Sequence, residues 1–364
     1  MLEKIQGMYN QIYDLAYQAI GIDLGTSNTL VYLKGKGIII EEPSVVALDK
    51  QSMKILAIGN SAKEMVGRTP GNIIAIRPLR DGVITNFEIA ERMIEHFLKL
   101  GKGQNLLLSS ITQPKIVIGI PTNATEVQKR AVREAALSAG AKTALLIQES
   151  IAAAIGSGID ISSSTGNLIV DIGGGTTETA VIALGTIISG SSIRTAGYAM
   201  DLAIQDYLKQ VYNVSIGEIS AENIKIQYGT AWPLEDEIIF KVRGQDILSG
   251  LPKEIEISTV EIRDALNQPI EEIITGIKQI IEKTPSELIT DVMRVGVTLA
   301  GGGALLKGIE TRIANATNFP IKVSLESKRA VIKGISLIIE DREILKILES
   351  TMQLKKVSSK IDIN

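Results

Sequence analysis

One glycine-containing turn pattern occurs twice in this chain, and the repeat constrains the fold more than any other feature. The copy at 20–31 reads IGIDLGTSNTLV, and the copy at 168–181 reads LIVDIGGGTTETAV. In each copy an apolar run ends in Asp, a turn containing Gly and Thr follows, and a second β-type run begins. Because Gly lacks a Cβ and tolerates positive φ, such a turn brings backbone N–H groups close to a phosphate. The repeat predicts two duplicated lobes that face one polyphosphate from opposite sides.

Composition limits the classes of protein to consider. The 364 residues exceed one typical domain, which fits two lobes. A net charge of −3 gives no basic field, so we expect no nucleic-acid partner. The absence of Cys excludes thiolate metal sites and disulfides, and the single His96 cannot anchor a histidine cluster. No apolar run reaches the roughly 18 residues of a membrane span, so we expect a cytoplasmic chain.

Hydrophobic periodicity predicts an α/β chain of alternating strands and helices. Residues 1–18 have apolar side chains at helical spacing and form an amphipathic segment that either docks on its own domain or lies on a membrane surface. The predicted strands include 29–33, 38–40, 115–121 and 145–147, and residues 232–260 are expected to be β-rich. The predicted helices include 87–100, 125–139, 151–156 and 331–339.

These elements divide the chain into two lobes with insertions. We expect lobe I to cover 19–160 and 326–350, with an inserted subdomain at about 40–85. Lobe II is expected to cover 161–325, with an inserted subdomain at about 205–260, and 351–364 form a flexible polar tail.

The glycine turns supply candidate nucleotide and metal ligands. Asp23 and Asp171 end the two strands and either hold a hydrated Mg²⁺, which takes few carboxylates beside water and phosphate oxygens, or cap their turns. The candidate phosphate-binding residues are Gly25, Thr26, Ser27, Asn28, Gly173, Gly174, Gly175, Thr176 and Thr177. A third turn either admits an adenine or ribose or is only a tight turn, and it contains Gly301, Gly302, Gly303, Ala304 and Leu305.

Polar residues elsewhere can support phosphoryl transfer to water, in which positioning and charge neutralisation supply most of the catalysis. Glu149 follows a predicted strand and either orients a water molecule or interacts with a helix dipole. Gln128 either holds water or completes a capping box with Thr125. Glu222 and Lys225, three residues apart on one helix face, either clasp a ribose or form a surface pair.

An aliphatic cluster lies inside a polar loop that precedes the predicted strand 115–121. It contains Leu106, Leu107 and Leu108. Loops seldom expose three leucines without a function. The cluster either contacts a membrane or partner or tucks against the core.

Taken together, the motifs resemble the superfamily of actin, Hsp70 and sugar kinases, and four segments are similar to the MreB family of bacterial actins. The segments are DLGTSNT at 23–29, IRPLRDGVI at 76–84, DIGGGTTE at 171–178 and AENIKI at 221–226. The similarity extends from about residue 19 to about residue 348. It implies an actin-like fold of two RNase-H-like lobes, with ATP and Mg²⁺ between them. It also implies an ATPase whose protofilaments pair on the inner face of the cell membrane, together with copies of itself or with paralogues.

The resemblance also assigns residues by matched position. Glu149 and Thr176 correspond to the family's water-orienting pair, and Leu106 and Leu107 fall in its membrane-inserting loop. Glu222 and Lys225 match the family's ribose and adenine contacts, and Asn223 and Ile224 between them are further candidate nucleotide-binding residues.

The chain departs from the family pattern near the expected catalytic residue. Where the family usually has Glu-Glu-Pro, this chain has Gln148, Glu149 and Ser150, so the carboxylate is kept and its rigid neighbour is lost. Slower or altered hydrolysis is expected. The chain also has a basic segment at 327–330, a long leucine loop and an Ile-rich composition. These features suggest a divergent paralogue from a wall-less bacterium, in which the filaments would serve shape or motility.

Three other functions remain open at this point. An Hsp70-like chaperone would need a substrate-binding region after the lobes, and this chain ends about where the lobes end. A sugar or acetate kinase would need a phosphate acceptor fixed in the cleft. A nucleotide-binding scaffold with negligible turnover fits the loss of the rigid residue at Ser150.

Overall fold

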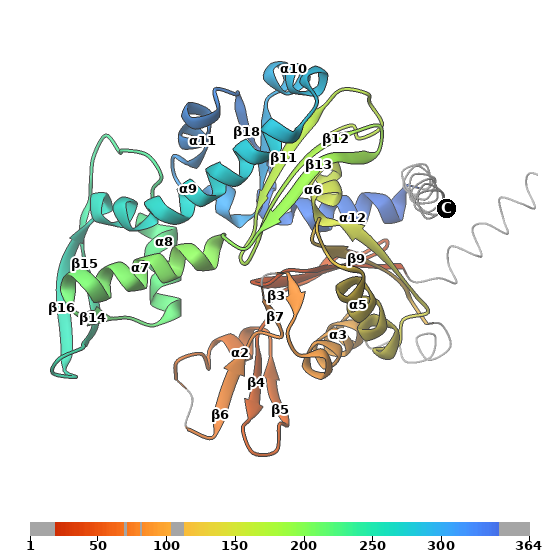
Figure 1. The fold of residues 1–364 in the computed structure, drawn as a ribbon. Helices are drawn as coiled ribbons and strands as arrows, with labels where there is room; N and C mark the ends of the chain where they lie inside the picture. Colours follow the sequence, from red (N-terminus) through yellow and green to blue (C-terminus); the bar gives the residue numbers. More distant parts are fainter. Residues whose placement is uncertain (1–18, 69–70, 81, 103–112, 342–364) are drawn as a thin grey trace, which may run out of the picture.

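The computed structural model describes residues 19–68, 71–80, 82–102 and 113–341, which form two lobes (Figure 1). Each lobe contains a five-stranded sheet, and the two sheets have the same topology. The lobe I sheet has the order β10-β9-β1-β2-β3, built from β1 (Ala19–Leu24), β2 (Asn28–Leu33), β3 (Gly37–Pro43), β9 (Lys115–Ile120) and β10 (Thr143–Gln148). The lobe II sheet has the order β18-β17-β11-β12-β13, built from β11 (Asn167–Ile172), β12 (Thr177–Ala183), β13 (Thr186–Ile193), β17 (Val297–Ala300) and β18 (Ile321–Val323).

In both sheets the first three strands form an antiparallel meander, and two later strands add in parallel. The central strands are buried along almost their whole length because helices cover both faces, so β1 and β11 are largely apolar runs in the sequence. The equal topology confirms the predicted α/β class with duplicated lobes.

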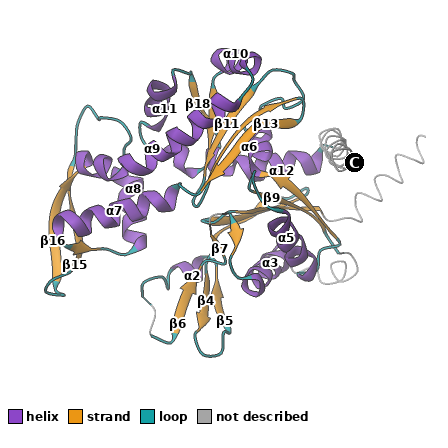
Figure 2. Ribbon diagram, viewed as in Figure 1, coloured by secondary structure: helices purple, strands orange, loops and turns teal. Residues whose placement is uncertain are grey.

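Helices fill the space beside and between the sheets (Figure 2). Lobe I is covered by α3 (Phe87–Lys102) and α5 (Glu126–Ser138), whose buried faces include Met93, Phe97 and Val132. The core between the two sheets contains α6 (Glu149–Gly156) and α12 (Ala330–Glu340). Lobe II is covered by α7 (Gly197–Tyr212), α9 (Thr259–Lys283), α10 (Ser286–Val295) and α11 (Ile309–Thr317).

The crossing of α6 and α12 depends on small residues. A Cβ on Gly156 would lie 1.9 Å from the Ala330 carbonyl oxygen, and one on Gly334 would lie 1.8 Å from that of Ala152. The predicted late helix, α12, packs on the lobe I sheet, where a Cβ on Gly21 would lie 2.6 Å from Ile335. Backbone-to-backbone contact therefore fixes how this helix sits between the sheets.

Each lobe carries an insertion of the kind expected from sequence. In lobe I a small sheet has the order β5-β4-β6, from β4 (Val46–Asp49), β5 (Ile55–Ile58) and β6 (Ile73–Ile76), beside α2 (Asn60–Lys63), β7 (Leu79–Arg80) and β8 (Val83–Ile84). In lobe II the insertion contains β14 (Val214–Ser215), α8 (Glu218–Tyr228), β15 (Ile239–Asp246) and β16 (Pro252–Ser258). The last two strands confirm the β-rich segment, whereas the exact lobe boundaries stay a prediction.

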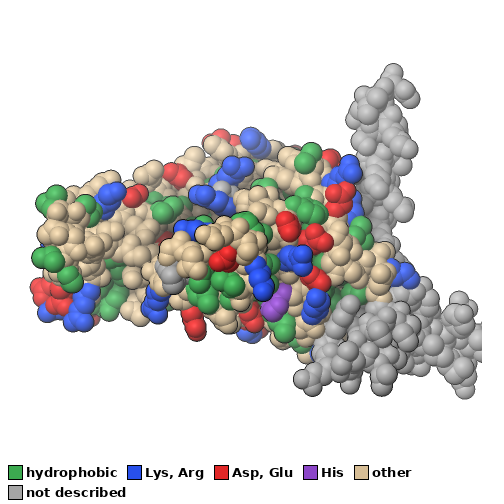
Figure 3. Space-filling view, turned by 90° about the horizontal axis from the view of Figure 1, so that it is seen from below, with side chains coloured by type: hydrophobic (Ala, Val, Ile, Leu, Met, Phe, Trp, Pro, Cys, Tyr) green, Lys and Arg blue, Asp and Glu red, His purple; other side chains and the backbone are tan. Residues whose placement is uncertain are grey.

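Several predicted segments lie outside the described residues, namely 1–18, the cluster of Leu106, Leu107 and Leu108, and the tail at 351–364. Within the part that the structure does describe, no helix has both the length and the apolarity needed to span a bilayer. On the face seen from below, Lys and Arg side chains are interspersed with Asp and Glu (Figure 3).

Candidate functional site

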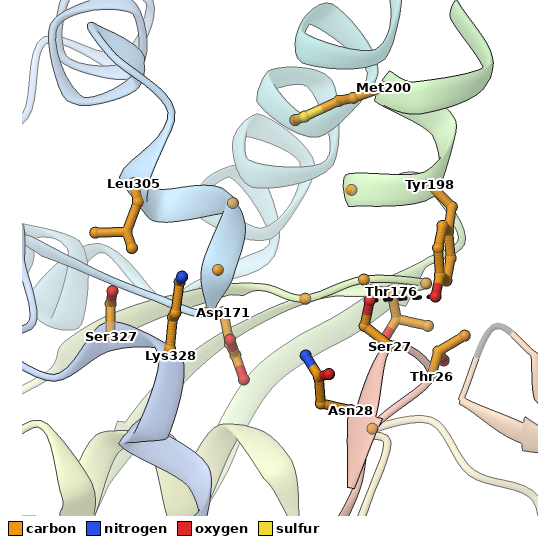
Figure 4. Close-up of a pocket in the computed structure, with 18 of the residues that line it drawn as sticks. Thr26, Ser27, Asn28, Asp171, Thr176, Tyr198, Met200, Leu305, Ser327 and Lys328 are labelled. Carbon is orange, nitrogen blue, oxygen red and sulfur yellow. Dashed lines mark hydrogen bonds between the residues drawn. The ribbon is translucent and has the colours of Figure 1, made fainter. Parts of the chain in front are cut away.

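The two repeated turns meet between the lobes and line a cavity of about 380 Å³ (Figure 4). This volume lies within the usual range of ligand pockets, about 300–1,000 Å³. The predicted residues that line it are Asp23, Gly25, Thr26, Ser27, Asn28, Glu149, Asp171, Gly173, Gly174, Gly175, Thr176, Glu222, Lys225, Gly301, Gly302, Gly303 and Leu305. The tertiary structure therefore gathers segments from both ends of the chain at one place.

Glycines allow the turns to approach each other. A Cβ on Gly174 would lie 2.7 Å from the Ser27 Cβ, and one on Gly175 would lie 2.6 Å from the Thr26 Oγ1. A side chain at either position would separate the two turns. The absence of a Cβ also leaves the backbone N–H groups of these turns accessible to a phosphate.

The third glycine turn has two kinds of glycine. Gly301 has a φ of +80° and packs against Ile172, where a Cβ would lie 2.2 Å from the Ile172 carbonyl oxygen. Gly303 packs against the same residue, and its Cβ would lie 2.3 Å from the Ile172 Cγ2. A Cβ on Gly302 would meet no described atom within 4 Å. Gly302 therefore faces open space in the cavity, and its Cα can be approached by a ligand.

Several buried carboxyl groups crowd together beside the turns. Burial raises the pKa of Asp23 to about 7 and, with repulsion from Asp23 and Glu178, raises that of Asp171 to about 8. Burial, then repulsion from Glu178, Asp23 and Asp171, raises the pKa of Glu149 well above its ordinary value. Ionisation of these carboxyl groups on their own is therefore unfavourable, and a bound cation would stabilise their charged forms.

The donor set fits Mg²⁺ rather than a metal held by protein alone. Within residues 19–68, 71–80, 82–102 and 113–341, no group of three or more His, Cys, Asp or Glu can hold a metal ion. Mg²⁺ takes one or two carboxylates and completes its shell with waters and phosphate oxygens. Asp23 and Asp171, next to the phosphate turns, are the carboxylates that fit this arrangement.

A buried ion pair lies beside the second glycine turn, next to Gly197. The Lys225 Nζ lies 2.8 Å from the Asp201 Oδ1 and donates a hydrogen bond of 2.9 Å to the Gly197 carbonyl. Burial raises the pKa of Asp201 to about 6, although Lys225 opposes the shift. Glu222 instead pairs with Lys63 of lobe I, at 2.8 Å. The alternative of a Glu222–Lys225 surface pair is therefore wrong.

Comparison with known proteins agrees with this geometry. The MreB/Mbl protein family matches residues 17–347. The chain belongs to the MreB/Mbl family. The cell shape-determining protein Mbl of Bacillus subtilis (strain 168) is 44% identical over 326 residues, which cover 90% of this chain and 97% of that protein.

Two solved structures of an MreB protein superpose on most of this chain. MreB5 of Spiroplasma citri bound to ADP has a TM-score of 0.84 and covers 89% of this chain and 96% of that one, at 35% identity. The same protein bound to AMPPNP has a TM-score of 0.85, covers 92% and 99% of the two chains, and is also 35% identical. The chain is thus an actin-like member of the cell shape-determining MreB/Mbl proteins, which confirms the predicted fold.

Four predicted residues of this family member do not line the cavity. Thr177 is buried and donates its hydroxyl to the Thr195 carbonyl at 2.7 Å. Ile224 and Ala304 have side chains in the lobe II core, and Asn223 is exposed on α8. Gln128 is also away from the cavity, because its side chain accepts from the Thr125 N–H at 2.8 Å and completes the predicted capping box.

Sequence reasoning missed several lining residues of the site. Tyr198 and Met200 come from the start of α7, and Ser327 and Lys328 come from η2 (Ser327–Arg329), with the Lys328 side chain pointing into the cavity (Figure 4). The basic departure at 327–330 was a signal for Lys328. No local pattern marks Tyr198, because its position depends on how α7 begins, where its N–H donates to the Gly174 carbonyl at 2.8 Å.

Proposed function

We propose that this MreB/Mbl chain binds ATP with Mg²⁺ in the cavity, hydrolyses it slowly, and polymerises into filaments on the inner face of the cell membrane. These filaments govern cell shape, or motility in a wall-less cell, alone or with paralogues. The single observation that carries the proposal is the meeting of both glycine turns with buried carboxylates at one cavity. The MreB5 structures, bound to ADP and AMPPNP, support a nucleotide as the ligand.

In this proposal, different protein groups bind the phosphates, the ribose, the base and the metal ion. Backbone N–H groups of the turns at 25–28 and 174–176 hold the phosphates, since both turns line the cavity. Lys225 and Glu222 bind the ribose, and Gly302 leaves space for the base. Asp23 and Asp171 would hold Mg²⁺, which, when bound, neutralises phosphate charge.

Glu149 and Thr176 carry the chemical step in this proposal. Glu149 begins α6 and lines the cavity beside Asp171, so its carboxylate can orient a water molecule towards the terminal phosphate. The Thr176 hydroxyl lies on the opposite lobe and can hold the same water. The water attacks the phosphorus, the bond to the ADP oxygen breaks, and the proton of the water passes to Glu149.

Phosphate release by the native chain and by Glu149→Gln tests this role. We expect the variant to hydrolyse ATP about 100-fold more slowly, because general-base catalysis contributes at least that factor, with unchanged ATP affinity. Equal rates would remove Glu149 from catalysis. Negligible release by both proteins would instead favour the nucleotide-binding scaffold.

Electron microscopy of the protein on liposomes, with and without Mg-ATP, tests assembly. We expect paired filaments on the lipid that depend on nucleotide. Protein that stayed monomeric over a wide concentration range would contradict the filament proposal. A phosphate acceptor that strongly increased turnover would favour a kinase instead.

A further inference from the structure

Thr122 contacts the residues on both sides of Glu149. The Gln148 Nε2 donates a hydrogen bond of 3.1 Å to the Thr122 carbonyl oxygen. The Ser150 Oγ lies 2.9 Å from the Thr122 Oγ1, and Ser150 is fully buried. Gln148 and Ser150 are the two positions at which this chain departs from Glu-Glu-Pro. Their polar side chains both form hydrogen bonds with Thr122.

Thr122 is itself held by the opposite lobe. Its N–H donates a hydrogen bond of 2.8 Å to the Glu178 Oε2 on β12. The other oxygen of Glu178 accepts from the Ser192 Oγ on β13 at 2.5 Å, and Glu178 is 1% exposed. We call the set of Thr122, Gln148, Ser150 and Glu178 the Thr122 clamp. It joins the first turn of α6 to the lobe II sheet.

Within the part of the chain that the structure describes, the Glu149 carboxylate lacks a hydrogen-bond donor that would direct it. Burial and nearby carboxylates dominate its surroundings. Its Cγ passes over Gly119, where a Cβ would lie 3.3 Å away. The position of the carboxylate therefore depends on the backbone at 148–150 and on the packing of its side chain over Gly119.

We propose that Thr122 is a positioning residue for Glu149, which it holds through hydrogen bonds on both sides in place of the restraint of a proline. This inference rests on the proposed role of Glu149 in hydrolysis. A displacement of about 1 Å at a catalytic group can cost roughly 100-fold in rate, so a loosened backbone lowers kcat. Substrate binding does not involve the clamp, because Thr122, Gln148 and Ser150 are absent from the cavity lining.

Five variants separate positioning from general structure. Ser150→Ala removes the hydroxyl pair with Thr122, and Thr122→Val removes that pair together with the side-chain hydrogen bond of Thr122 to Glu178, so the double variant should lose no more than Thr122→Val alone. Ser150→Pro restores a rigid residue in the first helical turn, where proline is tolerated. Ser189→Ala is the matched control, since it removes a similar hydroxyl pair with Thr284, at 2.8 Å, within lobe II.

We expect Ser150→Ala and Thr122→Val to lower kcat roughly tenfold with KM unchanged. Ser150→Pro should stay within about twofold of the native kcat, and Ser189→Ala should match the native protein. Normal kcat in Ser150→Ala, while Glu149→Gln is inactive, would overturn the clamp and leave the proposed function intact. A loss in Ser150→Pro equal to that in Ser150→Ala would also overturn it.

Amide hydrogen exchange over 148–156 gives a readout that is independent of hydrolysis. Exchange should be faster in Ser150→Ala and Thr122→Val than in the native protein, and near native in Ser150→Pro. Unchanged exchange in both hydroxyl variants would overturn the clamp, whether or not the native chain hydrolyses ATP. A native chain that hydrolysed no ATP would separately reject the proposed function.

Discussion

Lys63 and Glu222 form an ion pair that joins the two lobes, with 2.8 Å between the Lys63 Nζ and the Glu222 Oε2. Lys63 ends α2 in the lobe I insertion, and Glu222 lies on α8 in lobe II. One turn earlier on α8, Glu218 lies 2.6 Å from Arg77 of lobe I. The Arg77 guanidinium also stacks 4.6 Å from the centre of the Tyr198 ring. The acidic face of α8 thus connects the insertions of both lobes beside the cavity.

Removing this ion pair should speed nucleotide release. Because both side chains are partly exposed, the pair contributes at most about 1 kcal/mol, and Lys63→Ala should raise the ADP release rate by up to about fivefold. Stopped-flow measurement with a fluorescent ADP checks this. Lys129→Ala, which removes an ion pair within α5, is the control. Identical release from both variants would argue against a link between the insertions and the cavity.

Alanine at two glycines should separate ligand contact from folding. Gly302→Ala adds a Cβ that meets no described protein atom, so the melting temperature should stay within about 1 °C while ATP affinity falls roughly tenfold. Gly174→Ala places its Cβ 2.7 Å from Ser27, so both stability and affinity should fall. Calorimetric titration and thermal unfolding check this. Unchanged affinity in Gly302→Ala would mean that the nucleotide does not approach this turn.

Lys225→Ala should destabilise the protein without ligand. Asp201 is 2% exposed, and removal of one partner from a buried ion pair costs about 3 kcal/mol because the other charge is left uncompensated. Urea unfolding of the nucleotide-free protein measures the loss. The double variant Lys225→Ala/Asp201→Asn should recover part of it, because no buried charge remains. A double variant less stable than Lys225→Ala would contradict this explanation.

The nucleotide-free protein should lose stability as pH rises. The pKa of Asp23 is raised to about 7 and that of Asp171 to about 8, above their ordinary value of 3.8. Between about pH 4 and about pH 8 the folded state holds protons that the unfolded state has released, so the free energy of unfolding falls with increasing pH. Thermal unfolding with a chelator measures the slope.

Asp171→Asn should flatten this slope and raise the melting temperature near pH 8 by roughly 2 °C or more, since a buried charge is removed. Asp206→Asn removes the same charge from an exposed site on α7 and should leave the slope unchanged. A native protein that became more stable from about pH 5 to about pH 8 would contradict the electrostatic argument.

Local patterns predicted the parts of the site whose chemistry lies in consecutive residues. The turns after β1 and β11 were found because Asp, Gly and Thr follow one another there, and the capping box of Thr125 and Gln128 was found for the same reason. Ile224 was assigned to the nucleotide by its neighbours in the matched segment. The structure buries its side chain in lobe II, because residues two apart on a helix do not share a face.

The sequence by itself determined the duplicated lobes, the phosphate turns and the family, because strand periodicity and glycine turns are properties of short segments. Only the tertiary structure decided the partners of the functional groups. Lys225 pairs with Asp201, Glu222 with Lys63, and Ser150 with Thr122, across separations in the chain that no local pattern encodes. The Ser150–Thr122 contact depends on the packing of the two sheets around α6 and α12, whereas the other two depend on how α8 packs beside α7 and α2.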